Sequence, residues 1–280
     1  MHERSGFIME KIKRVFALIL VFALVSVIAP ATANAANITD VTATFNGQLI
    51  PDTKLIDSTT YLPLRKVCEA VGCTVGWIAS SKTVTVSGNG LEMTVGQDSF
   101  YLVANGRYIY MNGTAQNVNG TMYVPARPLA KAFGWSVEWD GSAKLTSGSG
   151  AIQSGSSFYK EDEVLWLARI ISAEAKGESL LGQIAVGNVV LNRVRSSQYP
   201  NTIYGVIFDK VGGVQFEPTI NGSVWNAPTE SAIIAAKLAL DGAAPVGNCL
   251  FFLNPTIAQS SWIQRNRTFY TRIGKHEFYL

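Results

Sequence analysis

The C-terminal half takes its fold from one stretch, Leu167-Ala168-Arg169-Ile170-Ile171-Ser172-Ala173-Glu174-Ala175-Lys176-Gly177-Glu178. In and around it, apolar residues recur every three or four positions, which predicts an amphipathic helix from residue 161 to about residue 176. Glu174 continues the apolar stripe of this helix. A carboxylate there is either paired or partly desolvated with a raised pKa. A raised pKa is what a general acid needs near neutral pH, and a structural Glu bonded to a helix cap is the alternative.

Further motifs follow in order towards the C-terminus. They occupy residues 182–194, 199–207, 215–216, 254–255 and 273–278. Together with the stretch above, they resemble the SleB-type, spore-cortex-lytic family of cell wall hydrolases, over roughly residues 165–280. The resemblance implies a mainly helical, lysozyme-like domain with a small sheet.

The same resemblance implies an activity. Members cleave peptidoglycan between N-acetylmuramic acid and N-acetylglucosamine, and Glu174 occupies the position of their catalytic acid. A lytic transglycosylase needs only this carboxyl, because the 6-hydroxyl of the sugar attacks the anomeric carbon, whereas a glycosidase needs two carboxylates at a defined separation. The alternative is a non-catalytic wall-binding or spore structural protein on a related fold.

Other residues of this half are candidates for substrate binding. Glu178 lies past Gly177, which is expected to end the helix, so it either contacts substrate or orients the following loop. Gln215 and Phe216 either line a glycan groove or pack within their loop, and Trp262 is a candidate for stacking on a sugar. His276, the one histidine after residue 35, is a candidate whose alternative is structural hydrogen bonding. Glu217 and Asp209 are weaker candidates for a second carboxylate.

The N-terminal half contains an internal repeat with an offset of 62 residues. Tyr, Pro, Arg, Ala, Gly, Val and Trp recur at the same spacing, from residue 61 to 77 and again from 123 to 139. Each unit predicts a strand, a helix begun by Pro63 or Pro125, a glycine stop at Gly72 or Gly134, and a second strand. Asn-Gly pairs at 46, 112 and 119 predict hairpin turns.

This repeat resembles the copper amine oxidase N-terminal-like domain. Residues 36–150 contain no histidine, so we expect no imidazole copper site, and no metal or other cofactor is expected anywhere in the chain. We interpret the repeats as a non-enzymatic wall-associated or positioning module whose ligand the sequence does not identify.

Composition completes the predicted organisation, which is an α+β protein in two domains. Residues 1–35 resemble a cleaved signal peptide, residues 36–146 hold the repeats, the Gly/Ser-rich residues 147–157 form a flexible linker, and residues 158–280 form the catalytic domain. We therefore expect a secreted protein associated with the cell wall or spore, with no membrane contact after cleavage; an uncleaved membrane anchor is the alternative. Its oligomeric state stays open.

The remaining composition excludes several classes. After residue 35 the chain carries 19 basic and 18 acidic residues, so it lacks the excess of positive charge that is typical of proteins that bind nucleic acid. The expected partner is peptidoglycan strands, as the family resemblance implies. A single histidine excludes the common zinc amidase ligand sets. Cys249 begins an apolar strand, which is a poor place for a nucleophile, and Cys68 and Cys73 either pair or are small core residues.

Overall fold

Two antiparallel strands, β5 (Thr59–Pro63) and β12 (Thr121–Pro125), join the two repeats in a computed structural model that describes residues 37–258 and 260–280. Leu62 lies opposite Val124 in this pair, and the two occupy the same position of the repeat. A local two-fold axis therefore passes between them and relates one repeat to the other. The predicted signal peptide lies outside the described residues, within which no helix is long and apolar enough to cross a membrane.

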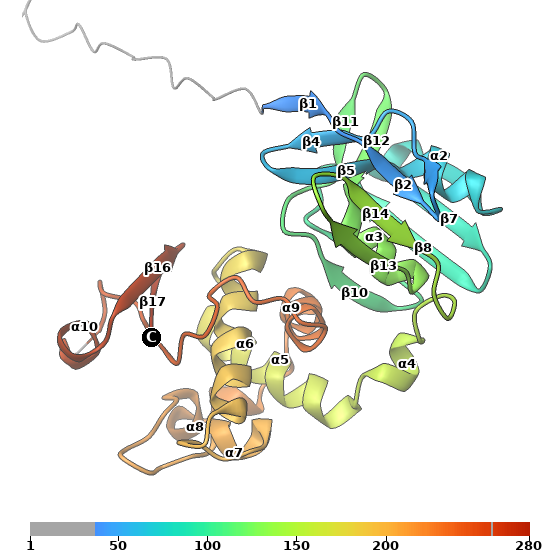
Figure 1. Cartoon of the computed structure of the whole chain (residues 1–280). Coiled ribbons are helices and arrows are strands. Elements are labelled where there is room, and N and C mark those ends of the chain that lie inside the picture. The colour runs from blue at the N-terminus through green and yellow to red at the C-terminus, as the bar shows by residue number, and fades with distance from the viewer. Residues whose placement is uncertain (1–36, 259) are drawn as a thin grey trace, which may run out of the picture. The chain divides into compact units, whose positions relative to one another are not determined.

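Three sheets build the repeat module (Figure 1). The first has the order β1 (Ile38–Asp40), β4 (Lys54–Ile56), β5, β12 and β11 (Gln116–Val118). The second has the order β10 (Arg107–Tyr110), β9 (Tyr101–Ala104), β8 (Leu91–Gly96), β7 (Thr83–Gly88) and β6 (Thr74–Ile78). The third has the order β13 (Ser136–Trp139), β14 (Ala143–Thr146), β2 (Ala43–Phe45) and β3 (Gln48–Leu49). Alternating burial along β7 and β8 gives each strand one face in the core.

The predicted helices of the repeats are present. They are α2 (Leu64–Ala70) and α3 (Ala126–Phe133). The prolines lie one residue earlier than predicted, as the N-cap residues Pro63 and Pro125. Gly72 and Gly134 have the positive φ angles expected of glycines that end helices. Cys68 and Cys73 are free thiols buried in the core of the module.

The Asn-Gly predictions are correct at two of three positions. Asn46-Gly47 and Asn119-Gly120 have positive φ at both residues, as a type I′ hairpin requires, and join β2 to β3 and β11 to β12. The prediction for Asn112 is wrong, because the chain there passes from one sheet to another. Gly113 is needed for space instead, since a Cβ would overlap the Tyr61 hydroxyl. Two further Asn-Gly hairpins are at 89–90 and 105–106.

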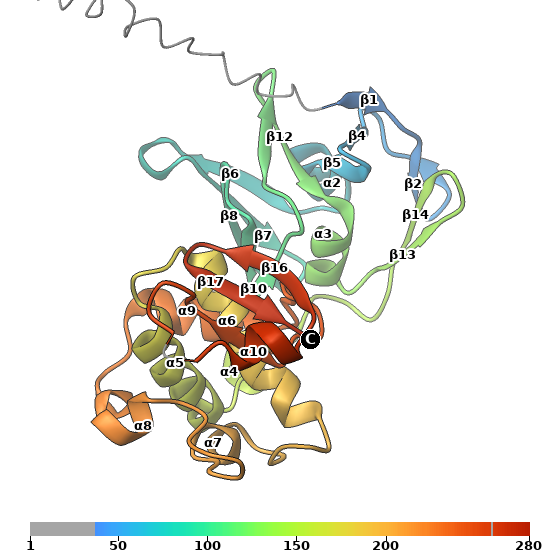
Figure 2. The ribbon, with the colours of Figure 1, turned by 90° about the vertical axis from the view of Figure 1, so that its left-hand side faces the viewer.

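The C-terminal half is helical with a small sheet, as expected. Helices α5 (Glu161–Ala175), α6 (Leu180–Arg195) and α9 (Glu230–Leu240) pack against one another (Figure 1). Gly187 permits the close approach of α6 to α5, because a Cβ there would lie 2.8 Å from the Ile171 side chain. The shorter elements are α7 (Ile203–Ile207), α8 (Pro218–Asn221) and α10 (Trp262–Asn266). A sheet of order β15 (Phe251–Leu253), β17 (His276–Tyr279) and β16 (Phe269–Ile273) packs on α6 (Figure 2).

The Gly/Ser-rich segment makes specific hydrogen bonds. The Ile152 amide donates to the Ala132 carbonyl at 3.0 Å, and the Gly155 amide donates to the Asn105 carbonyl at 2.7 Å. The Asn105 side chain returns a bond to the Ile152 carbonyl at 2.9 Å. Residues Gly155–Phe158 form a short helix, α4. This segment is thus held along part of its length, and residues 37–280 form one compact unit.

Candidate active site

Glu174 lies in the last turn of α5, with its side chain partly buried. Leu167, Ile170 and Ile171 on the same stripe have no exposed surface, so the core fixes the helix face from which Glu174 projects. The helix ends at Ala175, close to the predicted end, and Glu178 follows in the connection to α6. The sequence pattern therefore predicted correctly that this carboxyl extends the apolar stripe.

The surroundings of Glu174 favour its protonated form. Burial raises its pKa to about 7, the nearby negative charge of Glu217 adds to the rise, and the positive charge of Arg193 opposes it. Within residues 37–258 and 260–280, no basic nitrogen lies within 4.0 Å of this carboxylate. The result is an acid that still holds its proton near neutral pH.

Arg193 is a functional candidate that sequence reasoning did not single out. It lies on α6 and is buried, and its Nε donates to the Leu250 carbonyl at 2.8 Å. Its guanidinium lies over the rings of Tyr199, Phe216 and Phe251, at 5.1, 5.2 and 5.8 Å from their centroids. The available signal was a basic residue within the mainly apolar run of residues 189–194, because a buried charge needs a compensating environment.

Gln215 and Phe216 lie beside Arg193 but play different structural parts. The Gln215 Oε1 accepts a bond from Arg193 Nη1 at 3.4 Å, and its Nε2 donates to the carbonyls of Val211 and Gly213. Gln215 thus links the 211–213 loop to the arginine. Phe216 is only 2% exposed and belongs to the core, which favours support of the site over direct contact with substrate. The next residue, Glu217, is exposed.

Trp262 extends this cluster to the surface. It is 48% exposed on α10 and makes an edge contact with Phe251, with ring centroids 6.4 Å apart. Arg267 lies over both rings, at 4.4 Å from the Phe251 centroid and 5.1 Å from that of Trp262. Because Phe251 also contacts Arg193, Trp262 is connected to the surroundings of Glu174. An exposed indole at this position is suited to stacking on a sugar ring.

Glu178 is engaged by the hairpin between β16 and β17. Its Oε2 accepts a hydrogen bond from the Lys275 amide at 3.1 Å, and Gly274 provides the space for the contact, since a Cβ at 274 would overlap that oxygen. The geometry thus favours the loop-orienting interpretation of Glu178. Its predicted contact with substrate stays a prediction.

His276 follows this turn and is buried, with its ring perpendicular to that of Phe252 at 5.3 Å. Burial lowers its pKa, and the opposing effect of the Glu178 charge is smaller, so the ring is neutral at pH 7. Its Nδ1 has no hydrogen-bond partner among the described residues. Direct binding of substrate by His276 remains a prediction that its burial does not favour.

The other polar candidates do not form a metal site. Asp209 caps its own loop by accepting a bond from the Val211 amide at 2.9 Å. Among the residues that the structure describes, no group of three or more His, Cys, Asp or Glu side chains is arranged to hold a metal ion. The charged groups that act on Glu174 are the neighbouring carboxylate of Glu217 and the buried cation of Arg193.

Two protein families match the two halves of the chain. The Cell Wall Hydrolase family matches residues 177–279, and the Copper amine oxidase N-terminal domain family matches residues 42–147. Both resemblances drawn from the sequence are thereby confirmed. The first match begins three residues after Glu174, so it does not itself include the acid.

Individual relatives resemble the C-terminal half. A spore cortex-lytic enzyme of Bacillus cereus is 39% identical over 120 residues, which is 43% of this chain and 45% of that protein. The spore cortex-lytic enzyme of Bacillus subtilis is 36% identical over 120 residues, 43% of this chain and 38% of the relative. The chain thus spans less than half the length of these two relatives.

A solved structure and a shorter relative complete the comparison. The catalytic domain of the germination-specific lytic transglycosylase SleB from Bacillus anthracis is 37% identical, with 46% of this chain and 100% of that domain covered, at a TM-score of 0.41. The cell wall hydrolase CwlJ of Oceanobacillus iheyensis is 37% identical over 103 residues, which is 35% of this chain and 72% of that protein. Because the chain covers 72% of this CwlJ protein at 37% identity, it belongs to the cell wall hydrolase family.

Proposed function

We propose that the C-terminal half cleaves the glycan strands of peptidoglycan between N-acetylmuramic acid and N-acetylglucosamine, as a lytic transglycosylase that uses Glu174 for both proton transfers. The observation that carries the proposal is the state of Glu174, a partly buried carboxyl whose pKa is raised to about 7. A carboxyl of ordinary pKa would be ionised at neutral pH and could not act as the acid.

In the first step, protonated Glu174 donates its proton to the glycosidic oxygen, and the bond from the muramic acid C1 to that oxygen breaks. The leaving N-acetylglucosamine keeps this proton as a new hydroxyl group. The carboxylate left behind lies near the charge of Arg193, which favours the ionised form. The C1 centre then carries the positive charge of an oxocarbenium ion.

In the second step, the Glu174 carboxylate accepts the proton of the muramic acid 6-hydroxyl while that oxygen bonds to C1. The product is a 1,6-anhydro sugar, Glu174 is protonated again, and no water is consumed. Glu178 is already bonded to the Lys275 amide, which supports a scheme with one working carboxyl. Glu217 is placed to raise the pKa of Glu174, which helps the acid to keep its proton between turnovers.

The related enzymes act on spore cortex or cell wall, as their names state. We accordingly propose an exported protein that works at the wall or spore, with residues 158–280 as its catalytic domain. Trp262 and Gln215 are proposed to contact the glycan, and Glu178, Phe216 and His276 to support the site.

Mass spectrometry of digests tests this function. Purified cortex and vegetative peptidoglycan are each incubated with the full-length protein in water enriched in heavy oxygen. Products ending in 1,6-anhydro-N-acetylmuramic acid without heavy oxygen are expected. Reducing muramic acid ends that carry heavy oxygen would identify a hydrolase with a second carboxylate, and the absence of any cleavage would favour the non-catalytic alternative.

A further inference from the structure

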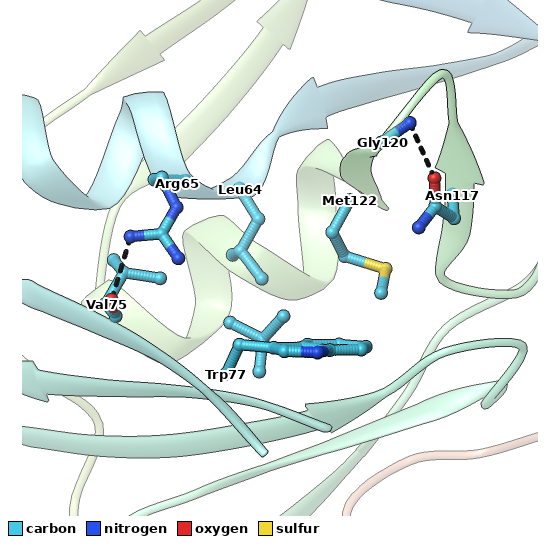
Figure 3. A pocket seen from close by; sticks show the side chains of 8 residues that line it. Leu64, Arg65, Val75, Trp77, Asn117, Gly120 and Met122 are labelled. Carbon is cyan, nitrogen blue, oxygen red and sulfur yellow. Dashed lines mark hydrogen bonds between the residues drawn. The ribbon is translucent and has the colours of Figure 1, made fainter. Parts of the chain in front are cut away.

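The repeat module contains two grooves that its two-fold axis relates to each other. The first is a cavity of about 440 Å³ whose lining includes Arg65 and Trp77 of the first repeat and Gly120 and Met122 of the second. In Figure 3 the Trp77 ring is seen edge-on, with Leu64 and Met122 directed towards it and Arg65 to one side. Arg65 is held there by a bond from Nη1 to the Val75 carbonyl at 2.8 Å.

The second groove has a volume of about 500 Å³ and contains the equivalent positions with the repeats exchanged. Arg127 and Trp139 of the second repeat face Ser58 and Thr60 of the first. Each is 62 residues from its counterpart in the first groove. Val84 and Ala143, which lie opposite Trp77 and Trp139 in their hairpins, also line the two grooves.

Both grooves contain the same exposed pair, a tryptophan and an arginine. Trp77 and Trp139 are 45% and 50% exposed, and the adjoining Arg65 and Arg127 are exposed as well. The positions opposite them differ between the grooves, because Met122 corresponds to Thr60 and Gly120 to Ser58. If selection acted only on packing, the two repeats would retain buried residues and their exposed residues would diverge. The retention of an exposed indole beside a guanidinium in both copies therefore indicates binding.

We propose that each groove binds a sugar unit of a peptidoglycan strand, with the pyranose ring on the tryptophan and a carboxylate of the muramic acid or its stem at the arginine. Indole faces suit the apolar faces of sugar rings, and guanidinium suits carboxylates. Each groove lining has one basic residue and no acidic one, which fits an anionic ligand. The choice of peptidoglycan rests on the proposed function of the C-terminal half.

Symmetry sets how the two grooves are used. A glycan strand has two different ends. The two-fold axis relates the grooves by a half-turn, so along a straight line through both grooves they have opposite directions. One straight strand therefore cannot occupy both grooves in the same manner, so the module is expected to hold two strands, or two folded segments of one. Two weak sites on one module give tighter retention on the intact polymer than on short fragments.

The grooves differ in charge. Arg65 is paired with Glu69 at 3.0 Å, whereas the equivalent of Glu69 in the second repeat is Lys131. The anion at Arg127 therefore competes with no carboxylate at that position. We expect the second groove to be the stronger of the two for carboxylate ligands.

Binding to insoluble peptidoglycan by the full-length Glu174→Gln protein tests the proposal without cleavage of the probe. The variants are Trp77→Ala, Trp139→Ala and their double, with Leu49→Ala as matched control, because Leu49 is exposed in the same module and lines neither groove. We expect the double variant to bind about tenfold more weakly or worse, each single variant to lose a few-fold, and Leu49→Ala to bind as the parent does. Trp→Phe versions, which retain a ring, should recover part of the loss.

Soluble probes separate the chemistry of the ligand. Muropeptide oligomers should bind more tightly than N-acetylglucosamine oligomers, and the free stem peptide should bind weakest. Arg127→Ala should reduce binding of the muropeptide more than Arg65→Ala, and neither should affect the N-acetylglucosamine oligomer. Unchanged binding by a folded double variant, or equal binding of the stem peptide alone, would overturn the proposal. Failure of cleavage in the digest experiment leaves this binding result unaffected, so the two proposals fail separately.

Discussion

The carboxylate of Asp241 accepts hydrogen bonds from Nε and Nη2 of Arg107 at 2.8 and 2.9 Å, although 134 residues separate the two in sequence. Lys131 donates to the same carboxylate at 2.6 Å and Tyr159 at 3.2 Å. The Asp241 side chain has no exposed surface. A charge buried this completely is tolerated only with such partners, so the contact between the two halves is specific.

Asp241→Asn should destabilise the protein markedly. It removes the negative charge that balances Arg107, which is itself largely buried, and we expect a loss of about 3 kcal/mol or more in the free energy of unfolding. Urea denaturation measures this loss. Glu163→Gln breaks the exposed pair with Lys160 and should cost less than about 1 kcal/mol. Equal effects of the two variants would contradict a structural role for Asp241.

Residues 158–280 produced alone should still fold and cleave soluble glycan fragments, because α5, α6 and α9 have their own core. Without Arg107 and Lys131, however, Asp241 becomes an unpaired carboxylate. We therefore expect a lower melting temperature than that of the full-length chain, and recovery of part of the loss by Asp241→Asn in the truncated protein only. A truncated protein that is insoluble beside an active full-length chain would argue against the domain boundary.

Cleavage should depend on pH through the acid form of Glu174. Its pKa is about 7, so kcat/KM is expected to fall about tenfold per pH unit above that value. Glu217→Gln removes one cause of the raised pKa of Glu174. It should therefore move the alkaline limb of the pH profile, which is this fall in kcat/KM, to lower pH. Glu163→Gln, on the exposed side of α5, serves as the control and should leave the limb in place. A limb that Glu217→Gln does not move would show that the charge of Glu217 does not act on the acid.

Glu174→Gln should remove activity and yet stabilise the protein at alkaline pH. The folded carboxyl holds its proton up to pH about 7, whereas the ordinary value is 4.5, so ionisation in the folded state costs stability as pH rises through this window. Above pH 7 the variant should gain up to about 3 kcal/mol, and near pH 4.5 the gain should nearly vanish. The expected loss in cleavage rate is about 10²- to 10⁴-fold. Thermal unfolding at both pH values, with circular dichroism, checks this.

The sequence predicted those features that depend on local spacing. The stripe on α5 placed Glu174 beside the core, and the repeat offset predicted the helices α2 and α3 together with the strands on either side of them. Both depend on residues that are neighbours along one element. The family resemblance then added a mainly helical C-terminal domain with a small sheet.

Contacts between distant segments could not be predicted in this way. Nothing local links Glu217 or Arg193 to Glu174, since their proximity results from the packing of α6 and the loop before α8. The Gly/Ser-rich segment has the composition of a flexible linker. It bonds to Asn105 through its own backbone groups, which every sequence possesses, so its side chains do not reveal these bonds. Asn112-Gly113 has the sequence of a hairpin turn, but the path between two sheets overrides that local preference.

Gly274→Ala should be more harmful than Glu178→Gln. The alanine Cβ would overlap the Glu178 Oε2, and Gly274 has a φ of 59°, so we expect a cost of roughly 1–3 kcal/mol in stability. Glu178→Gln keeps an oxygen that can accept the bond from Lys275 and should retain much of the activity. The double variant Glu178→Ala/Gly274→Ala should recover part of the loss, since a short side chain at 178 makes room. Strictly additive effects in this double-mutant cycle would show that the two positions are not coupled.

The contact between Glu178 and Gly274 also restricts how sequences of this kind can diverge. The positive φ of Gly274 strains any substitution there, and a long side chain at 178 adds an overlap that its own end must move to relieve, so the order of the two changes matters. We expect glycine at 274 in relatives with a long acidic side chain at 178, and the exceptions to glycine among relatives with a short side chain at 178. Reconstructed ancestors would record which route was taken.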